Sequence, residues 1–455
     1  MQDQTEMLAT ALPHYRTGEI PDEVRMVAKS SLLDWIGVSL AAAHSDPMRG
    51  LRDVLNPAAV PGNATLIGGG STSPMLAARL NGTAGHVLDF DDVLSSFGHP
   101  TVPVLPAALA LAEVHGASGD ALLRAFIGGI ETESRVSDMV GARHYEVGFH
   151  STATLGIFGA AAASAMLLGL DHEQTVTTLS LASISSSGLK SAFGSWGKSL
   201  QVGHAAAEGL IAAQLAQAGA TGPGTRLDGT QGYLRTHRVP GDPTIVADQL
   251  AAPSDDWRTL GMLFKYHASC YGTHSSIESL RRLRGEAGDA DVRAIRLGVS
   301  SRHIGMCDQT NARTELQGKF SLAFTSGLAW VRGSAGEADF HPSSMSDAQV
   351  QDMAARVQVL EDPARPFSTT EVEVELNDGR TLTSAIDMTI PAPMSELQDQ
   401  WGRLEQKFRS LTEPLLEVAV VDALVDAVRN VDDLGSATEL TAALAAAGAA
   451  LTPSH

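Results

Sequence analysis

The chain has 455 residues, of which 44% are apolar and 18% charged, and its formal net charge is −20. This length exceeds one ordinary hydrophobic core, so two domains are expected, and the apolar content is typical of a globular chain. The acidic balance repels phosphate backbones and argues against nucleic-acid binding.

Targeting and cross-linking signals are few. The two cysteines, Cys270 and Cys307, do not form a multi-bridge disulfide framework or a zinc-ribbon pattern. The N-terminus lacks the basic and apolar regions of a signal peptide. The longest apolar run, residues 155–170, is shorter than the roughly 20 residues of a membrane span. We therefore expect a cytoplasmic protein that does not cross a membrane.

The first 265 residues show helical periodicity and no convincing alternating run. Residues 151–168 are apolar all round, which predicts one central, fully buried helix. The other helices are predicted over 21–43, from Pro74, from Pro103 and Pro106 to Gly116, after Ser118, over 172–183 and over 200–218.

The pattern changes after about residue 285. Residues 291–300 and 371–376 alternate at period two, and Asn377-Asp378-Gly379 predicts a hairpin turn after the second run. Helical stretches lie between them, near 314–331 and 346–357, and helical periodicity returns from residue 394. We predict a mainly α protein: a large all-helical domain built from both chain ends (1–268 and 393–455), with a smaller α+β lid domain inserted at 269–392.

The stretch from Asn81 to Glu113 contains the first candidate site. Asp89, Asp91 and Asp92 fall within four positions, and His99 precedes a proline. Carboxylates and an imidazole on a short loop between apolar helices can exchange protons with a substrate, although such acidic runs are as often caps or solvated surface. The neighbouring like charges predict a raised pKa for Asp89, while His99 could serve as base or acid.

Further candidates precede predicted helices. His150 precedes the central helix, where Ser151 could help to form a cap and a cradle for a carboxylate. Lys198 lies in a glycine-rich loop before an apolar helix that contains His204. The alternative interpretations are a helix-entry residue for His150 and a solvated side chain for Lys198, which is the favoured interpretation for that lysine alone.

Lys265, His267 and His274 cluster near the expected domain junction, where pockets are common. Taken with the earlier candidates, they form a cationic, imidazole-rich set within an acidic chain. Such a set suits a small anionic polycarboxylate, because each charge-assisted hydrogen bond contributes about 1.5–3 kcal/mol. The chain has no H-E-x-x-H, phosphate-loop or nucleophile-elbow motif. We therefore predict no metal and no cofactor, and expect proton transfer beside a carboxylate.

At these residues the chain resembles the MmgE/PrpD family, which contains 2-methylcitrate dehydratase, cis-aconitate decarboxylase and iminodisuccinate epimerase. The segments that carry the resemblance are LLDWIGVSLAA (32–42), NGTAGHVLDFDD (81–92), GHPTVPVLPAALALAE (98–113), GFHSTATLGIFGAAAA (148–163), GKSLQVGHAAAEG (197–209), KYHASCYGTH (265–274) and KFSLAF (319–324). The resemblance implies a helical domain with an α+β lid, a pocket between them, a homodimer, and no metal or organic cofactor.

Matched motif by motif, the resemblance implies catalytic roles for a set of pocket residues: Asp89, His99, His150, Lys198 and Lys265. It implies substrate binding by Ser151, Gln201, His204 and, less firmly, His274. The chain departs from the family pattern K-P-L-H-x-G-R, because Gln201 replaces an imidazole and His204 replaces an arginine that would clamp a carboxylate. These departures bear on the substrate more than on the type of reaction.

The first hypothesis is a cofactor-independent lyase acting on a small di- or tricarboxylate, in the manner of a 2-methylcitrate dehydratase. An epimerase of the iminodisuccinate type and a decarboxylase of the cis-aconitate type are the alternatives within enzymes. A non-catalytic binding protein on the same fold is the alternative outside them.

Overall fold

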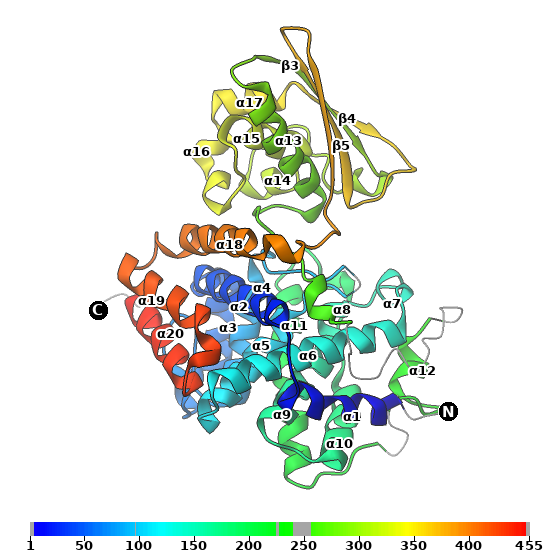
Figure 1. The fold of residues 1–455 in the computed structure, drawn as a ribbon, viewed down its shortest axis with the longest axis vertical. Coiled ribbons are helices and arrows are strands. Elements are labelled where there is room, and N and C mark those ends of the chain that lie inside the picture. Colours follow the sequence, from blue (N-terminus) through cyan, green and yellow to red (C-terminus); the bar gives the residue numbers. More distant parts are fainter. Residues whose placement is uncertain (1–3, 96, 224–226, 240–255, 452–455) are drawn as a thin grey trace. The chain divides into compact units, whose positions relative to one another are not determined.

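The computed structural model describes residues 4–95, 97–223, 227–239 and 256–451. The chain divides into two compact units (Figure 1), the first formed by Met1–Met262 and Ala392–His455 and the second by Leu263–Pro391. The predicted mainly α class is confirmed, with a large helical unit built from both chain ends. We placed the first boundary at residue 268, whereas the second unit begins at Leu263 and therefore contains Lys265.

The first unit is helical over most of its described length. Its helices are α1 (Gln4–Thr17), α2 (Asp22–Ala42), α3 (Asp46–Leu55), α4 (Pro74–Val87), α5 (Thr101–His115), α6 (Gly119–Val140), α7 (Arg143–Glu146), α8 (Ser151–Thr154), α9 (Gly156–Leu167), α10 (His172–Ser185), α11 (Gly197–Gln217), α12 (Tyr233–His237), α18 (Leu397–Thr412), α19 (Val418–Arg429) and α20 (Ala437–Leu451).

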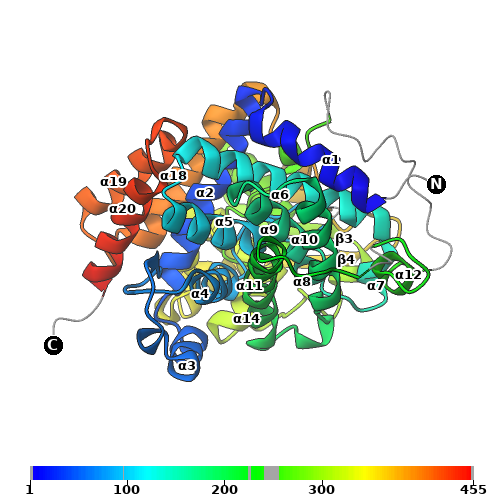
Figure 2. The same cartoon turned by 90° about the horizontal axis from the view of Figure 1, so that it is seen from below.

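Helix α9 lies at the centre of this unit and packs against α5, α6 and α11 (Figure 2). Its residues from Gly156 to Met166 are buried, as expected for a helix that is apolar all round. The single helix predicted over 151–168 is nevertheless divided at Leu155, so α8 is a separate short turn. Gly156 lies against Pro103, whose Cγ would be 2.3 Å from an added Cβ.

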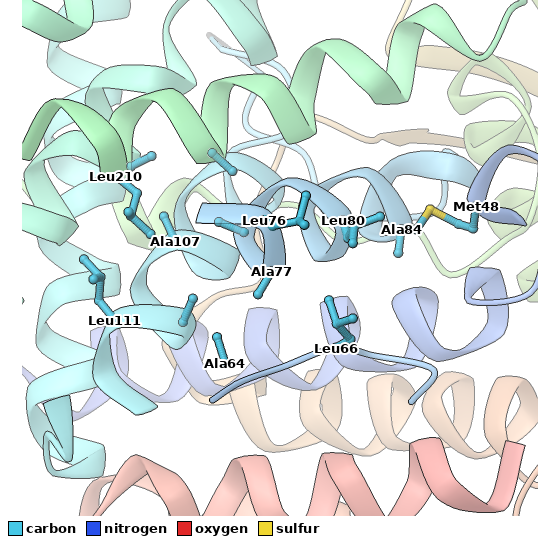
Figure 3. Close-up of a cluster of buried hydrophobic side chains, with 14 residues drawn as sticks. Met48, Ala64, Leu66, Leu76, Ala77, Leu80, Ala84, Ala107, Leu111 and Leu210 are labelled. Carbon is cyan, nitrogen blue, oxygen red and sulfur yellow. The ribbon is translucent and has the colours of Figure 1, made fainter. Parts of the chain in front are cut away.

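Small residues let α4 and α11 approach closely. A Cβ added to Gly203 of α11 would lie 2.1 Å from Thr83 Oγ1 and 2.3 Å from the Arg79 carbonyl oxygen, both on α4. Beside this contact is a cluster of buried side chains from α4, α5 and α11 that includes Leu80 and Leu210 (Figure 3). The close packing fixes the start of α11 beside the chain that leaves α4.

The ends of several helices differ from the prediction. Helix α5 begins at Thr101 and contains Pro106, and α11 begins at Gly197, so Lys198 lies in the first turn of a helix rather than in a loop. The predicted end of α5 at Gly116 and the predicted start of α6 after Ser118 are confirmed: Gly116 ends α5 in the left-handed conformation, and the Ser118 side chain accepts a hydrogen bond from the Ala121 N–H of α6.

The first unit also contains a small hairpin that the sequence did not predict. Strand β1 (Ala64–Thr65) pairs antiparallel with β2 (Ser71–Thr72). Two residues are too short to show alternation, and the Gly68–Gly70 turn has positive φ at all three glycines.

The second unit combines helices with a four-stranded sheet. Its helices are α13 (His274–Ala287), α14 (Glu315–Lys319), α15 (Leu322–Arg332), α16 (Pro342–Met345) and α17 (Ala348–Ala354), and its strands are β3 (Val292–Val299), β4 (Val357–Glu361), β5 (Thr369–Leu376) and β6 (Thr381–Asp387). The strand order is β4-β3-β5-β6, with β3 and β4 parallel and the other pairs antiparallel. The predicted β5–β6 hairpin is confirmed, whereas β4 was not predicted: the helix expected near 346–357 ends at Ala354, and the strand begins at Val357.

No single described helix is both long and apolar enough to cross a membrane. One pair of consecutive helical segments with a bend between them, Asp22–Ala42 and Asp46–Ala59, is together long and apolar enough for a membrane span, by length and composition only.

Candidate active site

The candidate site in the first unit begins where the chain leaves α4. Asp89 adopts a left-handed backbone with φ +51, an uncommon conformation for a residue other than glycine. Ten residues later the His99 N–H donates to Thr152 Oγ1 of α8 at 3.2 Å. Gly98 has φ +131, and a Cβ there would lie 2.7 Å from the same oxygen. Glycine is therefore needed for the loop to close against α8.

Four side chains of this segment, His86, Asp89, Asp91 and His99, meet in what we call the His/Asp cluster. Asp91 Oδ2 lies 2.9 Å from His86 Nδ1 and 3.0 Å from His99 Nδ1. On its other side the His99 ring places Nε2 3.4 Å from Asp89 Oδ1. The rings of His86 and His99 meet edge-on with centroids 4.6 Å apart. One carboxylate therefore contacts two imidazoles through the same type of nitrogen.

The buried half of the cluster is electrostatically paired. Burial alone would raise the pKa of Asp91, but the imidazoles of His86 and His99 hold it well below its ordinary value. Burial lowers the pKa of His86 to about 4, although Asp91 acts in the opposite direction. Asp91 is thus an anion at neutral pH, which favours a hydrogen on Nδ1 of His99 and leaves Nε2 for chemistry.

The outer half of the cluster reaches solvent and a cation. Lys198, from the first turn of α11, donates to Asp89 Oδ1 at 2.7 Å. The exposed fractions of the side chains are 43% for Asp89, 18% for Lys198 and 14% for His99, compared with 1% for Asp91. A small anion arriving from solvent would therefore meet Asp89, Lys198 and His99 before the buried pair.

The like-charge argument made for Asp89 holds for its neighbour Asp92, and the raised pKa expected for Asp89 stays a prediction. Asp89 faces the ammonium of Lys198, whereas burial and the nearby carboxylate of Asp34 raise the pKa of Asp92 to about 8. Thr101 Oγ1 donates to Asp92 Oδ2 at 2.5 Å. Asp34 in turn lies 2.6 Å from the ammonium of Lys407 on α18. Asp92 thus belongs to a buried network beside the His/Asp cluster.

His150 is held by Gln201, one of the two residues that depart from the family pattern. Gln201 Oε1 accepts the Leu189 N–H at 3.1 Å, and its Nε2 donates to the Leu189 carbonyl at 3.3 Å, which fixes the orientation of the amide. The same Oε1 lies 3.0 Å from His150 Nδ1, so that nitrogen carries the hydrogen. Burial, followed by the neighbouring His86, lowers the pKa of His150 to about 3. His150 is therefore neutral, and the cation at this site is Lys198.

Phe193 adds an apolar surface to the same place. Its ring meets His150 edge-on at a centroid distance of 5.0 Å, and Lys198 Nζ lies 5.3 Å from its centroid. An apolar face beside an ammonium reduces the access of water to that charge, which strengthens its interaction with an anion.

Two of the predicted substrate-binding residues lie at other positions in the first unit. Ser151 is the first residue of α8 and is buried, with its carbonyl accepting the Leu155 N–H. His204 lies one turn after Gln201 on α11, 3.8 Å from Glu208, and burial lowers its pKa. The structure thus brings together Asp89, His99, His150, Lys198 and Gln201, and does not bring His204 into the same set of contacts.

The remaining candidates lie in the second unit. Lys265 and His274 are buried there, and His267 Nε2 lies 2.6 Å from Glu278 Oε1. His274 is fully buried, with Nε2 3.3 Å from the Ser269 carbonyl, and burial and the neighbouring His267 lower its pKa well below the ordinary value. Catalysis by Lys265 and substrate binding by His274 stay predictions from the sequence.

The His/Asp cluster also has the composition of a metal site. Its ligand atoms all lie within 4.8 Å of one another, and imidazole and carboxylate are common ligands of divalent ions such as Zn²⁺. The same atoms already form the Asp91–imidazole contacts, so a bound ion would have to replace them. The sequence-based expectation of no metal stays a prediction.

The sequence did not identify His86 or the two imidazole contacts of Asp91. The signal was present in H-x-x-D-F-D-D, where a histidine in the last turn of a helix precedes an aspartate by five residues. The contact requires the chain to turn back at Asp89, and only the left-handed backbone there shows that it does.

Comparisons with known proteins give the family of this chain. Residues 6–245 match the MmgE/PrpD N-terminal domain, and residues 267–433 match the MmgE/PrpD C-terminal domain. The cis-aconitate decarboxylase-like protein oryM of Aspergillus oryzae is 26% identical, over 96% of this chain and 96% of its own length. The cis-aconitate decarboxylase of Homo sapiens is 26% identical over 97% of this chain and 94% of its own, and that of Mus musculus 25% over 97% and 93%. These matches support an enzyme of the lyase type, and the chain belongs to the MmgE/PrpD family.

Proposed function

We propose that this protein is a lyase that uses its own side chains to move a proton at a carbon next to a carboxylate of a small di- or tricarboxylate. One observation carries the proposal: an imidazole backed by a buried carboxylate stands beside a partly exposed lysine–aspartate pair. The contacts are His99 Nδ1 to Asp91 Oδ2 at 3.0 Å and Lys198 Nζ to Asp89 Oδ1 at 2.7 Å.

His99 is the proposed proton carrier. Because Asp91 favours a hydrogen on Nδ1, Nε2 is the nitrogen that accepts a proton from carbon or returns it. Asp91 then stabilises the imidazolium that forms, as a buried carboxylate does in other His–Asp pairs. Asp89 lies 3.4 Å from Nε2 and can exchange the same proton, so base and acid act within one set of contacts.

Lys198 is the proposed electrostatic partner. Proton removal beside a carboxylate places negative charge on the carboxylate oxygens, and an ammonium at hydrogen-bond distance stabilises that charge. In the substrate complex a substrate carboxylate would share the Nζ hydrogens with Asp89. Gln201 and His150 would support the neighbouring wall, with His150 as a neutral hydrogen-bonding group.

Two reactions use this arrangement. In a hydro-lyase, the base takes the α-proton and an acid protonates the hydroxyl group that leaves as water; this is the reaction expected from the sequence. In a carboxy-lyase, a carbon–carbon bond breaks, carbon dioxide leaves, and the acid adds a proton to the resulting carbanion. The names of the curated relatives favour this second reaction. Both reactions share a carbanion next to a retained carboxylate.

The decisive experiment is proton NMR in D₂O with a panel of di- and tricarboxylates preselected by thermal shift. Loss of a hydroxyl-bearing substrate with gain of an alkene signal would identify the hydro-lyase. Release of carbon dioxide with deuterium in the product would identify the carboxy-lyase. Deuterium exchange without net elimination would identify the epimerase alternative. Binding of polycarboxylates with none of these changes would leave the non-catalytic binding protein as the better description.

Variants test the assignment of residues. His99→Ala and Lys198→Ala are each expected to lower turnover by about 100-fold or more, as for loss of a general base or a charge-stabilising donor. The matched controls are His172→Ala and Lys190→Ala, because His172 pairs with Glu6 and Lys190 lies over the Tyr145 ring. Unchanged turnover in the first two variants would show that the proposed site is wrong.

A further inference from the structure

The two cysteines of the chain lie together in the second unit, although 37 positions separate them. Cys270 follows the segment that begins the unit, and Cys307 lies in the loop after β3. The Cys307 thiol donates to Cys270 Sγ at 3.1 Å, and both residues are in the thiol form. A disulfide bond needs a sulfur–sulfur distance of about 2.0 Å, so an approach of roughly 1 Å would join them.

Backbone hydrogen bonds hold both cysteines against the same stretch of chain, residues 319–322. The Cys270 N–H donates to the Lys319 carbonyl at 2.8 Å, and the Cys307 carbonyl accepts the Leu322 N–H at 2.7 Å. An isolated bridge between Asp308 and Ser321 ties the same loop to the same stretch. Both cysteines are therefore fixed against residues 319–322, and the proximity of the sulfurs does not depend on their side chains alone.

We propose that Cys270 and Cys307 form a reversible intramolecular disulfide that ties the segment 263–274 to the loop after β3. The segment contains Lys265 and His274, so the bond would restrain two residues implied in the site by family resemblance. The proposal rests on the geometry of the second unit and stands whether or not the proposed lyase reaction is correct.

The accessibility of the two sulfurs decides which cysteine is oxidised first. Cys270 is partly exposed, whereas Cys307 is buried, so an oxidant reaches Cys270 first. The thiol of Cys307 points its hydrogen at Cys270, which favours negative charge on the Cys270 sulfur. That hydrogen bond and burial also raise the pKa of Cys307, which keeps it a thiol until its partner is oxidised.

With hydrogen peroxide as the oxidant, the Cys270 sulfur attacks one peroxide oxygen, the oxygen–oxygen bond breaks, and a sulfenic acid and water form. The Cys307 sulfur then attacks the sulfenic sulfur, and its proton leaves with the displaced hydroxide as water. Two thiols and one peroxide thus give one disulfide and two waters. Dithiothreitol reverses the change by thiol–disulfide exchange.

The test uses the full-length protein treated with hydrogen peroxide, then denatured and alkylated with iodoacetamide. The expected result is loss of both alkylation sites, a mass lower by two hydrogens, a cross-linked peptide pair containing Cys270 and Cys307, and recovery of both sites after dithiothreitol. Hydrogen exchange of residues 263–274 should slow by about tenfold or more in the oxidised protein. The Cys270→Ser/Cys307→Ser double variant should show no such change.

Single variants test the proposed order without requiring a disulfide. In Cys307→Ser, peroxide should leave a Cys270 sulfenic acid that dimedone traps, whereas in folded Cys270→Ser the buried Cys307 should stay unmodified. Three results would overturn the proposal: both thiols of the wild type remain alkylatable after excess peroxide, both cysteines gain oxygen irreversibly, or the bond forms between two chains.

Discussion

Replacing Asp91 by asparagine tests the most specific feature of the site. Asp91 is fully buried and contacts His86 Nδ1 at 2.9 Å and His99 Nδ1 at 3.0 Å. Asparagine keeps the shape of the side chain but removes its charge and can present an N–H where an acceptor is needed. His99 would then lose the partner that favours its Nδ1–H form and stabilises its imidazolium.

The expected size of the effect follows from these contacts. A charge-assisted hydrogen bond contributes about 1.5–3 kcal/mol, and a pair of unit charges about 4 Å apart near a protein surface interacts by about 4 kcal/mol. Only the part gained when His99 becomes protonated in the transition state affects the rate. We take this part as about 2–3 kcal/mol, which corresponds to a loss of about 30- to 150-fold in kcat. KM should change less, because Asp91 is buried behind His99.

The assay is kcat and KM with the polycarboxylate that the NMR panel identifies. A second readout, ¹⁵N-histidine NMR, needs no substrate: the wild type should show His99 with its hydrogen on Nδ1, and Asp91→Asn should shift the population towards Nε2. The matched control is Asp92→Asn, which changes the adjacent buried aspartate without touching an imidazole. The reasoning is refuted if folded Asp91→Asn retains more than about a third of wild-type kcat and an unchanged His99 tautomer.

Three further outcomes are expected. Burial and Asp34 raise the pKa of Asp92 to about 8, so the folded state binds the Asp92 proton more tightly than the unfolded state does. The free energy of unfolding gained from this tighter binding is fully present below about pH 4 and is lost as the pH rises to about 8. Asp92→Asn should therefore be more stable than the wild type at pH 7, by at most about 4 kcal/mol, and should show no gain in stability near pH 4. Urea unfolding at several pH values measures the free energy of unfolding of both proteins, and an equal difference at pH 4 and pH 7 would contradict the prediction. Gln201→Leu removes the acceptor of His150 and the clamp on Leu189, and should lower the melting temperature by several degrees and kcat by about tenfold, whereas Gln201→Glu should retain the acceptor and more of the activity. Dialysis against a chelator should leave turnover unchanged and added Zn²⁺ should inhibit by occupying the His/Asp cluster; loss of activity on chelation, restored by metal, would show a metal-dependent enzyme instead.

Periodicity was sufficient to predict most helices and the β5–β6 hairpin, because long apolar faces and the Asn-Asp-Gly turn are local signals. Periodicity failed where the end of a helix is set by a contact between segments that are distant in the sequence. The break at Leu155 lies beside Pro103, and Gly197 begins α11 earlier than the apolar pattern does. Because α11 begins earlier, Lys198 lies in the first turn of that helix, whereas the sequence predicted that it would lie in a loop.

The candidate site shows the same limit more sharply. Family resemblance selected Asp89, His99 and Lys198, and Asp89 does contact both His99 and Lys198. The sequence could not say which of the neighbouring aspartates holds which partner, because the pKa of a buried carboxyl depends on the groups it faces rather than on its neighbours along the chain. Burial and the facing carboxylate of Asp34 raise the pKa of Asp92, which the run of aspartates in the sequence did not single out.

The three aspartates illustrate how one short loop serves three physical purposes. The left-handed backbone at Asp89 turns its carboxylate to the solvent edge and to Lys198, where it can be reached by a substrate. Two residues on, Asp91 faces inward between two imidazoles and is held as an anion, 3.0 Å from His99 Nδ1. Asp92 is buried and faces a second carboxylate, so its protonated form is the more stable one at neutral pH. Burial and the groups that each carboxylate faces thus separate a charged site, a fixed anion and a neutral acid. The close contact of α4 with α11 at Gly203 brings the required cation to the first of them.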